Sequence, residues 1–291
     1  MDDFISAAAM PTAAVSAAIA PPHSGEREGH SEPLSNNGDR SSPSQPRDTA
    51  DRPHTPAQIM IVVHQADSDP GLIGQLLQQR GYRLDIRCPA IGDRLPAVMD
   101  DYAATVVFGG PMSANDDDTL PFIRTELDWL PTVLEAQMPF LGVCLGAQLL
   151  ARVLGGKVSP HPDGIREIGY FSIAPTAAGR SEFAAPMSVY HWHREGFEVP
   201  RDAVCLASGD TFANQAFRYG NSAYGVQFHP EITRPLIHKW TTKAADQLSL
   251  PGAKPRDRHF DDHDRHSDAV KLWLDQFLDR WLVSATQPTI A

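Results

Sequence analysis

The stretch PFLGVCLGAQLLARVLGG, residues 139–156, constrains the fold more than any other part of this sequence. It joins a short apolar run to a segment of strong helix formers that ends in two glycines. This pattern predicts a strand, a tight turn and a helix closed by glycine. Cys144 lies at the junction, with Gly142 and Gly146 two residues away on either side.

The same alternation occurs upstream of this stretch. Apolar runs typical of strands are followed by helical patterns, and the helix expected over 120–137 contains Pro131, which we expect to end or kink it. Strands that are apolar throughout indicate a parallel sheet covered on both faces, so we expect an α/β fold with a mostly parallel central sheet flanked by helices. After Lys157 strand patterns dominate and predict a smaller antiparallel β region. The predicted strands are IMIVV, RLDIR, ATVVFGG and PFLGV, then IREIGYFSI, MSVYHW, AVCLASG and SAYGVQFH.

The two ends of the chain have different compositions. Residues 1–56 begin with an acidic stretch that lacks the positive charge of a secretion signal, and they continue with many polar residues, prolines and glycines. We expect this segment to be a disordered leader. Residues 57–291 are expected to form one domain. Its last segment, 267–283, has apolar residues at helical spacing and predicts an amphipathic helix with Ser267 as N-cap. This helix can dock on the domain, which the pattern favours, or offer a face to a partner.

Charge and cysteine content narrow the class of protein. The chain has 36 acidic and 25 basic side chains, for a formal net charge of −11. This balance argues against a nucleic-acid or anionic-membrane partner. Three cysteines, an odd number, do not suit a disulfide scaffold and favour a reducing, cytoplasmic setting.

A cysteine between a strand and a helix suits nucleophilic chemistry. The turn exposes the sulfur at the carboxyl edge of the sheet, as in the G-x-S-x-G elbow of hydrolases, and the flanking glycines remove Cβ atoms that would collide. The N-terminus of the helix favours thiolate over thiol, and the N–H of Leu145 faces an oxyanion formed at the sulfur. A small buried structural cysteine remains an alternative on these seven residues alone.

The segment YGVQFHPE, residues 224–231, supplies a matching base. Pro230 holds His229 in an extended conformation, and residues two apart in extended chain project to the same side. Glu231 can then bond one ring nitrogen of His229 and leave the other for the sulfur, which is the arrangement of a triad.

Together, GVCLGAQ and GVQFHPE resemble the class I, triad-type glutamine amidotransferases, with the greatest similarity to the amidotransferase domain of GMP synthase and its free-standing relatives. FGGPMS (108–113) looks like the glycine-rich oxyanion loop of that family, and GIREIGY and HWHREGFEVP fall where it has similar segments. The resemblance covers about residues 58–235. It implies a flavodoxin-like fold and hydrolysis of the side-chain amide of glutamine.

The resemblance also assigns roles to residues. It implies that Cys144 is the nucleophile, His229 the general base and Glu231 its partner. The oxyanion is then held by backbone N–H groups at Gly110 and Leu145. No metal or organic cofactor is required by this chemistry.

The implied substrate pocket contains Gly109, Gln148, Trp192 and His193. Here the sequence departs from the family pattern, because Arg194 and Glu195 stand where the family has Gly-Asp. A changed substrate preference follows as an expectation.

Three functions remain open at this point. The first is a free-standing glutaminase that releases glutamate and ammonia, with a possible synthetase partner, since no phosphate-binding Ser-Gly-Gly type loop follows His229. The second is a hydrolase of γ-glutamyl amides or peptides through the same triad, because the two substrates differ only in the leaving group. The third is a catalytically silent regulator on the same fold.

Other polar residues have simpler interpretations. The segment RDRHFDDHDRH, residues 256–266, contains metal-capable side chains, but we expect a charged loop ahead of the last helix. Four histidines without a recognisable partner are expected at the surface or in packing, and two cysteines are expected to be structural. These are His54, His64, His161 and His238, with Cys88 and Cys205.

Overall fold

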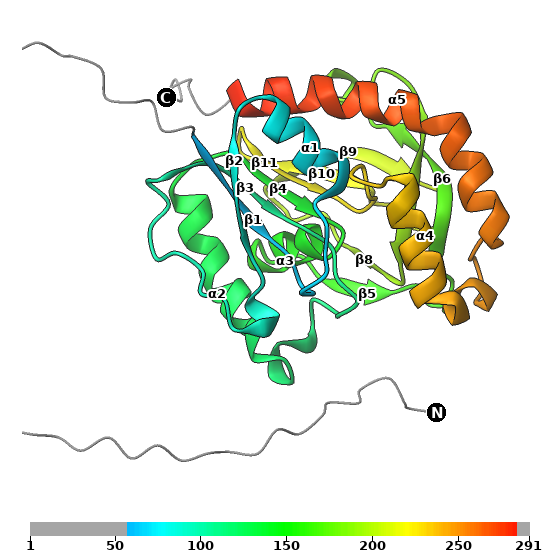
Figure 1. The fold of residues 1–291 in the computed structure, drawn as a ribbon, viewed down its shortest axis with the longest axis horizontal. Coiled ribbons are helices and arrows are strands. Elements are labelled where there is room, and N and C mark those ends of the chain that lie inside the picture. Colours follow the sequence, from blue (N-terminus) through cyan, green and yellow to red (C-terminus); the bar gives the residue numbers. More distant parts are fainter. Residues whose placement is uncertain (1–56, 284–291) are drawn as a thin grey trace, which may run out of the picture. The chain divides into compact units, whose positions relative to one another are not determined.

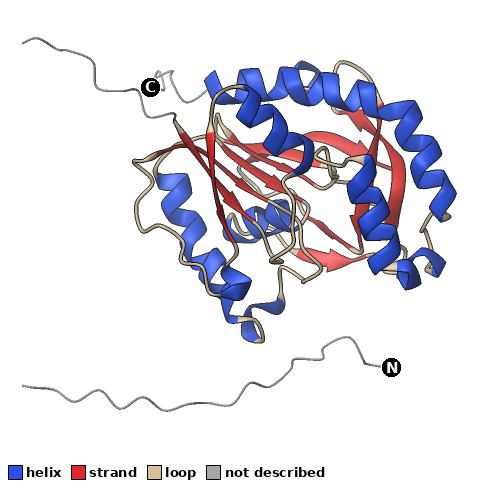
Figure 2. Ribbon diagram, in the orientation of Figure 1, coloured by secondary structure: helices blue, strands red, loops and turns tan. Residues whose placement is uncertain are grey.

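The structure is a computed structural model that describes residues 57–283, so the predicted leader and the last residues of the predicted domain lie outside the described part of the chain. A nine-stranded sheet dominates it, in the order β2-β1-β3-β4-β11-β10-β9-β6-β7 (Figures 1 and 2). A second, two-stranded sheet pairs β5 (Val158–Pro160) with β8 (Glu195–Phe197). The nine strands are β1 (Gln58–Val62), β2 (Arg83–Arg87), β3 (Tyr102–Val107), β4 (Phe140–Val143), β6 (Glu167–Pro175), β7 (Met187–His193), β9 (Ala203–Gly209), β10 (Ala216–Tyr219) and β11 (Ala223–Val226).

The sheet has a parallel half and an antiparallel half. Strands β2, β1, β3, β4 and β11 pair in parallel, whereas β10, β9, β6 and β7 continue the same sheet with antiparallel pairing. The predicted α/β class is therefore confirmed. The antiparallel strands extend the edge of the parallel sheet, and a small separate antiparallel sheet accompanies them.

Helices cover both faces of the parallel half (Figure 2). Alternate residues of β1 explain how: Ile59 and Ile61 join the core beneath α1 and α5, while Met60 and Val62 join the core beneath α2 and α3. The helices are α1 (Gly71–Gln79), α2 (Pro121–Glu135), α3 (Leu145–Val153), α4 (Arg234–Lys243) and α5 (Arg256–Val283). Short 3₁₀ turns lie at Pro89–Ile91, Asp116–Asp118, Ala178–Ser181 and Ala245–Ser249.

Strand register brings four chain segments to one edge of the sheet. Val107 of β3 lies opposite Gly142 of β4, and Val226 of β11 lies opposite Val143. Because these strands and β1 run parallel, the segments that follow them all leave the sheet at the same carboxyl edge. Cys144, the glycine pair after β3 and the segment leading to His229 therefore meet at this edge. His64, the second residue after β1, lies there as well.

Three local expectations were wrong. Residues 256–266 are not a loop: α5 begins at Arg256, so Ser267 lies inside the helix and is not its N-cap. Arginines and aspartates three and four residues apart pair along this turn, including Arg258 and Asp262 at 3.0 Å, which stabilises the helical form. Pro131 does not end α2, which continues to Glu135, and it lies on the exposed face of the helix.

The C-terminal helix docks on the domain, as its pattern favours. Val270, Trp273, Leu274, Phe277, Leu278 and Trp281 are all buried in the core beneath α1 and α5. Trp273 stacks on Phe183 with ring centroids 5.1 Å apart. The apolar stripe of α5 is therefore occupied within the chain.

We predict that docking of α5 contributes strongly to stability. Leu274 is fully buried, whereas Leu272 of the same helix is 60 % exposed. Leu274→Ala should lower the free energy of unfolding by about 2–5 kcal/mol, because it removes buried carbon and leaves a cavity. Leu272→Ala, with the same change in helix propensity, should alter it by less than about 0.5 kcal/mol. Urea unfolding measures both, and equal losses would contradict the docked helix.

Candidate active site

Cys144 occupies a sharp bend between β4 and α3. Its φ is 51° and its ψ −104°, a backbone conformation that L-residues rarely adopt. A Cβ atom at Gly146 would lie 2.1 Å from the carbonyl oxygen of Val107, and one at Gly142 would lie 2.6 Å from the carbonyl of Gly146. Only glycine fits at these two positions, so the predicted elbow is confirmed in its geometry.

The sulfur of Cys144 lies at the start of α3, in a buried setting. The residue is 4 % exposed, and its backbone N–H donates to Val226 at 2.8 Å. The side-chain amide of Gln227 donates towards the sulfur over 3.7 Å, and the carbonyl oxygen of Trp192 lies 4.0 Å from it. A helix N-terminus and an amide donor therefore both lie at the sulfur.

His229 and Glu231 form a buried pair beside this bend. Nδ1 of His229 lies 2.8 Å from Oε1 of Glu231, and the two residues are 4 % and 3 % exposed. Trp240 packs edge-on against the imidazole, with ring centroids 4.9 Å apart. Since Nδ1 donates to the carboxylate, Nε2 is left with its lone pair or a second proton, and no other described residue bonds it.

The route to this pair differs from the one expected from sequence. β11 ends at Val226, and Pro230 and Glu231 lie in a turn closed by the Ile232 N–H and the His229 carbonyl at 3.3 Å. The side chains meet across this turn and not along an extended strand.

The glycine pair after β3 lies directly against both groups. A Cβ atom at Gly109 would be 2.8 Å from Cε1 of His229 and 3.3 Å from Cβ of Cys144. One at Gly110 would be 3.1 Å from the Leu145 side chain. The structure therefore brings the three predicted triad residues and the two predicted oxyanion residues together.

The electrostatics of His229 follow from these neighbours. Burial acts to lower the pKa of the ring, but the charges of Glu231 and Cys144 and the hydrogen bond to Glu231 outweigh it and raise the pKa to about 10. An imidazolium is the form that stabilises a neighbouring thiolate and that can later donate a proton.

The remaining predicted pocket residues have different surroundings. The amide nitrogen of Gln148 donates to the Glu195 carbonyl at 2.8 Å and to the Gln227 side chain at 3.2 Å. Nδ1 of His193 lies 3.0 Å from the same Glu195 carbonyl. The ring of Trp192 packs against Tyr190, Trp240 and His259.

A second buried cluster lies behind this pocket, and sequence reasoning missed it. Oε2 of Glu167 lies 3.0 Å from Nε2 of His193 and 3.4 Å from Nδ1 of His191, and Gln215 donates to the same oxygen at 2.9 Å. The only signal in the sequence was the H-x-H spacing in a strand, which places His191 and His193 on one side.

The cluster is a hydrogen-bonded group of one glutamate, two histidines and one glutamine. The glutamate and the two histidines have metal-capable atoms within 4.8 Å of one another. Nε2 of His193 lies 3.0 Å from Oε2 of Glu167 and 3.1 Å from Nδ1 of His191, while its Nδ1 faces the Glu195 carbonyl. Burial lowers the pKa of His191 to about 3; for Glu167, burial acts to raise the pKa, but His193 and His191 outweigh it and lower the pKa to about 2. The cluster holds the 193–195 turn, and with it the carbonyl that Gln148 contacts.

Three of the four histidines without a partner recognisable in the sequence have one in the structure, and His54 lies outside the described residues. His64 is buried and bonded to Glu126 and the Gly109 carbonyl, and Nδ1 of His161 accepts from the Asp163 N–H at 3.2 Å. His238 accepts from Arg256 at 3.0 Å, and in the 256–266 segment His259 and His263 bond Tyr190 and Tyr170. Cys88 is buried and Cys205 is half-buried in β9, in agreement with structural thiols.

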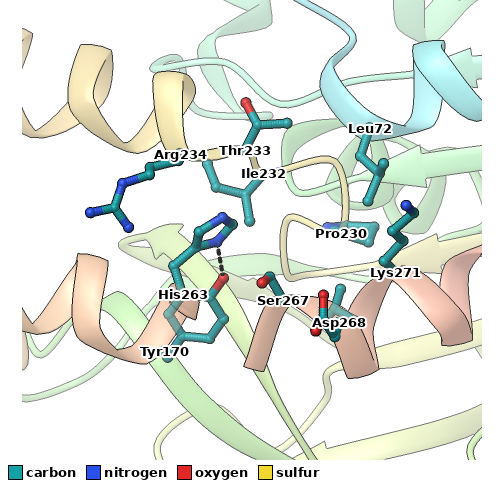
Figure 3. A pocket seen from close by; sticks show the side chains of 11 residues that line it. Leu72, Tyr170, Pro230, Ile232, Thr233, Arg234, His263, Ser267, Asp268 and Lys271 are labelled. Carbon is teal, nitrogen blue, oxygen red and sulfur yellow. Dashed lines mark hydrogen bonds between the residues drawn. The ribbon is translucent and has the colours of Figure 1, made fainter. Parts of the chain in front are cut away.

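A separate cavity of about 160 Å³ lies between α1, α4 and α5 (Figure 3). Pro230 and Ile232 of the turn contribute to its wall, but Cys144, His229 and Glu231 do not. Figure 3 shows the Tyr170 hydroxyl bonded to His263 on one side of it, at 2.8 Å. The cavity is therefore distinct from the space around the sulfur.

Comparison with known proteins agrees with this geometry. The family model for class-I glutamine amidotransferases matches residues 72–239. The glutamine amidotransferase-like protein YfeJ of Salmonella typhimurium is 32% identical over 200 residues, which cover 66% of this chain and 83% of YfeJ. A glutamine-hydrolyzing GMP synthase of Phenylobacterium zucineum is 30% identical, and the match covers 72% of this chain but 42% of the synthase. The chain thus spans less than half the length of that synthase.

Solved structures that resemble this chain are also glutamine amidotransferases. A glutamine amidotransferase from Thermotoga maritima superposes with a TM-score of 0.72 and 27% identity, covering 79% of this chain and 99% of that protein. A glutamine amidotransferase from Methylobacillus flagellatus gives the same TM-score at 26% identity. Within residues 57–283, no helix combines the length and the apolar character needed to cross a membrane.

The raised pKa of His229 predicts a pH dependence of stability. Below the ordinary pKa of 6.5 the His229 ring is protonated in both the folded and the unfolded states, so its full contribution to the free energy of unfolding is present. As the pH rises towards 10, the unfolded chain loses the proton first, and this contribution is lost. The free energy of unfolding should therefore fall between about pH 7 and about pH 9. Glu231→Gln, which removes the charge that holds the proton, should flatten this fall. Parallel pH profiles of the two proteins in urea unfolding would contradict the assignment.

Proposed function

The chain belongs to the class-I glutamine amidotransferase family, and we propose that it hydrolyses the side-chain amide of glutamine through a thioester on Cys144. One observation carries the proposal: a single backbone position, Gly109, lies against both Cβ of Cys144 and the His229 ring, whose Nδ1 is bonded to Glu231. This arrangement supports a nucleophile, a base and an orienting carboxylate that act together at one edge of the sheet.

The first half of the reaction forms the thioester. The thiolate of Cys144 attacks the carboxamide carbon, and a C–S bond forms as the carbonyl π electrons move to oxygen. When that oxyanion collapses, the C–N bond breaks and His229 gives its proton to the departing nitrogen, which leaves as ammonia. Glu231 keeps the imidazolium oriented and balances its charge.

The second half releases glutamate. His229, now neutral, accepts a proton from water as the water oxygen attacks the thioester carbon. Collapse of this second oxyanion expels the thiolate, which returns the pair to its initial charge state.

The oxyanion in both halves is stabilised by two backbone donors. The N–H of Leu145 belongs to the first turn of α3, where helical N–H groups have no intrahelical acceptor, so it is available to a ligand. The second donor is the N–H of Gly110, whose position contacts the Leu145 side chain. Together they place positive ends of peptide dipoles at the sulfur's bend.

The relatives suggest a use for the ammonia that the reaction releases. GMP synthases of this group are glutamine-hydrolyzing, and the chain matches less than half of one of them. We propose that the ammonia released here is used by a synthetase partner, whose identity is open.

The direct test is loss of activity in Cys144→Ala. We expect ammonia release from glutamine to fall at least about a thousandfold, because both half-reactions pass through the sulfur. Cys205→Ala is the matched control, since this thiol lies in β9 away from the bend, and it should retain activity. A wild-type protein that releases no ammonia from any amide would support the silent-regulator alternative instead.

A second candidate, hydrolysis of γ-glutamyl amides or peptides, is favoured by one observation. Arg194, which replaces the glycine of the family pattern, lies in the turn held by Gln148 and His193. In the register of β6 and β7, Glu167 lies opposite His193, so Arg166 and Arg194 are the next residues of the two neighbouring chain segments, and burial together with the charge of Arg194 lowers the pKa of Arg166. A pair of arginines beside the pocket suits a leaving group that carries a carboxylate.

A substrate panel separates the two candidates. If the arginine pair binds the leaving group, γ-glutamyl-glycine should be a better substrate than γ-glutamyl-methylamide, which has no carboxylate. Arg194→Ala should then lower kcat/KM for γ-glutamyl-glycine about tenfold and leave that for glutamine unchanged. Arg180→Ala, an exposed arginine elsewhere, serves as control. Equal effects on both substrates would remove the second candidate.

A further inference from the structure

A buried histidine–glutamate pair that the triad does not use lies behind the glycine pair. His64 follows β1 and Glu126 lies in the middle of α2, and each is 1 % exposed. Nε2 of His64 is 3.0 Å from Oε2 of Glu126, and Nδ1 is 3.1 Å from the carbonyl oxygen of Gly109. One ring thus connects the inner face of α2 to the loop at the nucleophile.

The acceptors fix the hydrogens of this ring. A carbonyl oxygen only accepts, so Nδ1 must donate to Gly109. The other contact also requires a hydrogen, on Nε2 if Glu126 is ionised or on Oε2 if it is not. In either form the ring is held at both ends and its donor remains directed at Gly109.

The peptide between Gly109 and Gly110 needs a hydrogen bond that fixes its orientation. Neither residue has a side chain, so the peptide between them is less restricted than one flanked by larger residues. Within residues 57–283, His64 is the only hydrogen-bond donor to the Gly109 carbonyl. Contact reinforces this, because a Cβ atom at Gly110 would lie 2.8 Å from Cβ of His64.

The carbonyl of Gly109 and the N–H of Gly110 belong to one peptide unit. That unit is planar and trans, so its C=O and N–H point in opposite directions. A donor that fixes the carbonyl on one side therefore aims the N–H on the other. It also polarises the unit, since hydrogen bonds in a chain strengthen one another.

We propose that His64 and Glu126 are positioning residues that orient and polarise the Gly109–Gly110 peptide, so that the Gly110 N–H serves as an oxyanion donor. The inference rests on the proposed function, because it assigns a role within that reaction. It explains why a glutamate is buried in α2 with Oε1 unpartnered among the described residues, at a cost that an apolar residue would avoid.

The test compares two variants of nearly equal shape. In His64→Asn the amide nitrogen can take the place of Nδ1 and donate to Gly109, whereas His64→Leu fills the same space without a donor. Both lose the contact with Glu126, so their melting temperatures should be similar. Steady-state hydrolysis of glutamine gives kcat and KM, and alkylation of Cys144 by iodoacetamide, a displacement with no oxyanion, reports on the sulfur alone.

We expect kcat of the leucine variant to be at least about tenfold below that of the asparagine variant, with KM and the alkylation rate of the two within about twofold. Equal kcat values in an active protein would overturn the inference and leave the proposed function intact. Equal falls in kcat and alkylation would also overturn it, because the role would then be structural. If the leucine variant does not fold, His64→Gln, which can reach Glu126 but not donate to Gly109, should show the same loss of kcat. A wild type inactive on glutamine and on γ-glutamyl amides would remove both proposals.

Discussion

The close approach of α3 to the sheet at Cys144 is the constraint on which the rest of the structure depends. Gly142 and Gly146 have no room for a side chain, and the cysteine between them takes up the bend with a positive φ. A conformation of this kind costs of order 1–3 kcal/mol, and it persists here because β4 is paired on both sides and α3 is buried. The bend lifts the sulfur out of the sheet at the edge where β3 and β11 also end. Parallel register then brings the glycine pair and the histidine segment to it without any further adjustment.

Around this bend the protein repeats one device. His229, His64 and His193 are each buried and each bonded to a glutamate, which fixes the orientation of the ring. The second nitrogen of His64 then faces the Gly109 carbonyl, and that of His193 faces the Glu195 carbonyl. In a buried setting such bonds are strong and their loss is costly, so they hold the loops of the site more firmly than exposed contacts would. The histidine rings of the site, and the backbone groups they contact, are thus held in place by buried hydrogen bonds.

The sequence allowed the core of this arrangement to be predicted, but not its supports. Apolar strands alternating with helices, and a cysteine between two glycines, are local patterns, and the structure follows them closely. The supports were missed because each joins residues distant in the chain: His64 meets Glu126 across 62 positions and Gln215 meets Glu167 across 48. Local patterns also failed where tertiary contacts decide the conformation. The acidic and basic run at 256–266 is helical because it continues α5 over the sheet, and His229 lies beyond the strand because Pro230 closes a turn.

The central claim is that the sulfur of Cys144, placed by this bend, takes the acyl group of the substrate. The most direct measurement is peptide mass spectrometry of His229→Asn after brief incubation with glutamine and an acid quench, since loss of the base slows hydrolysis of the thioester. The account predicts a mass increase of one γ-glutamyl group on the peptide that contains Cys144, and none on those with Cys88 or Cys205. A wild-type enzyme that turns over glutamine while the group is found on another residue, or on none under any quench, would contradict it.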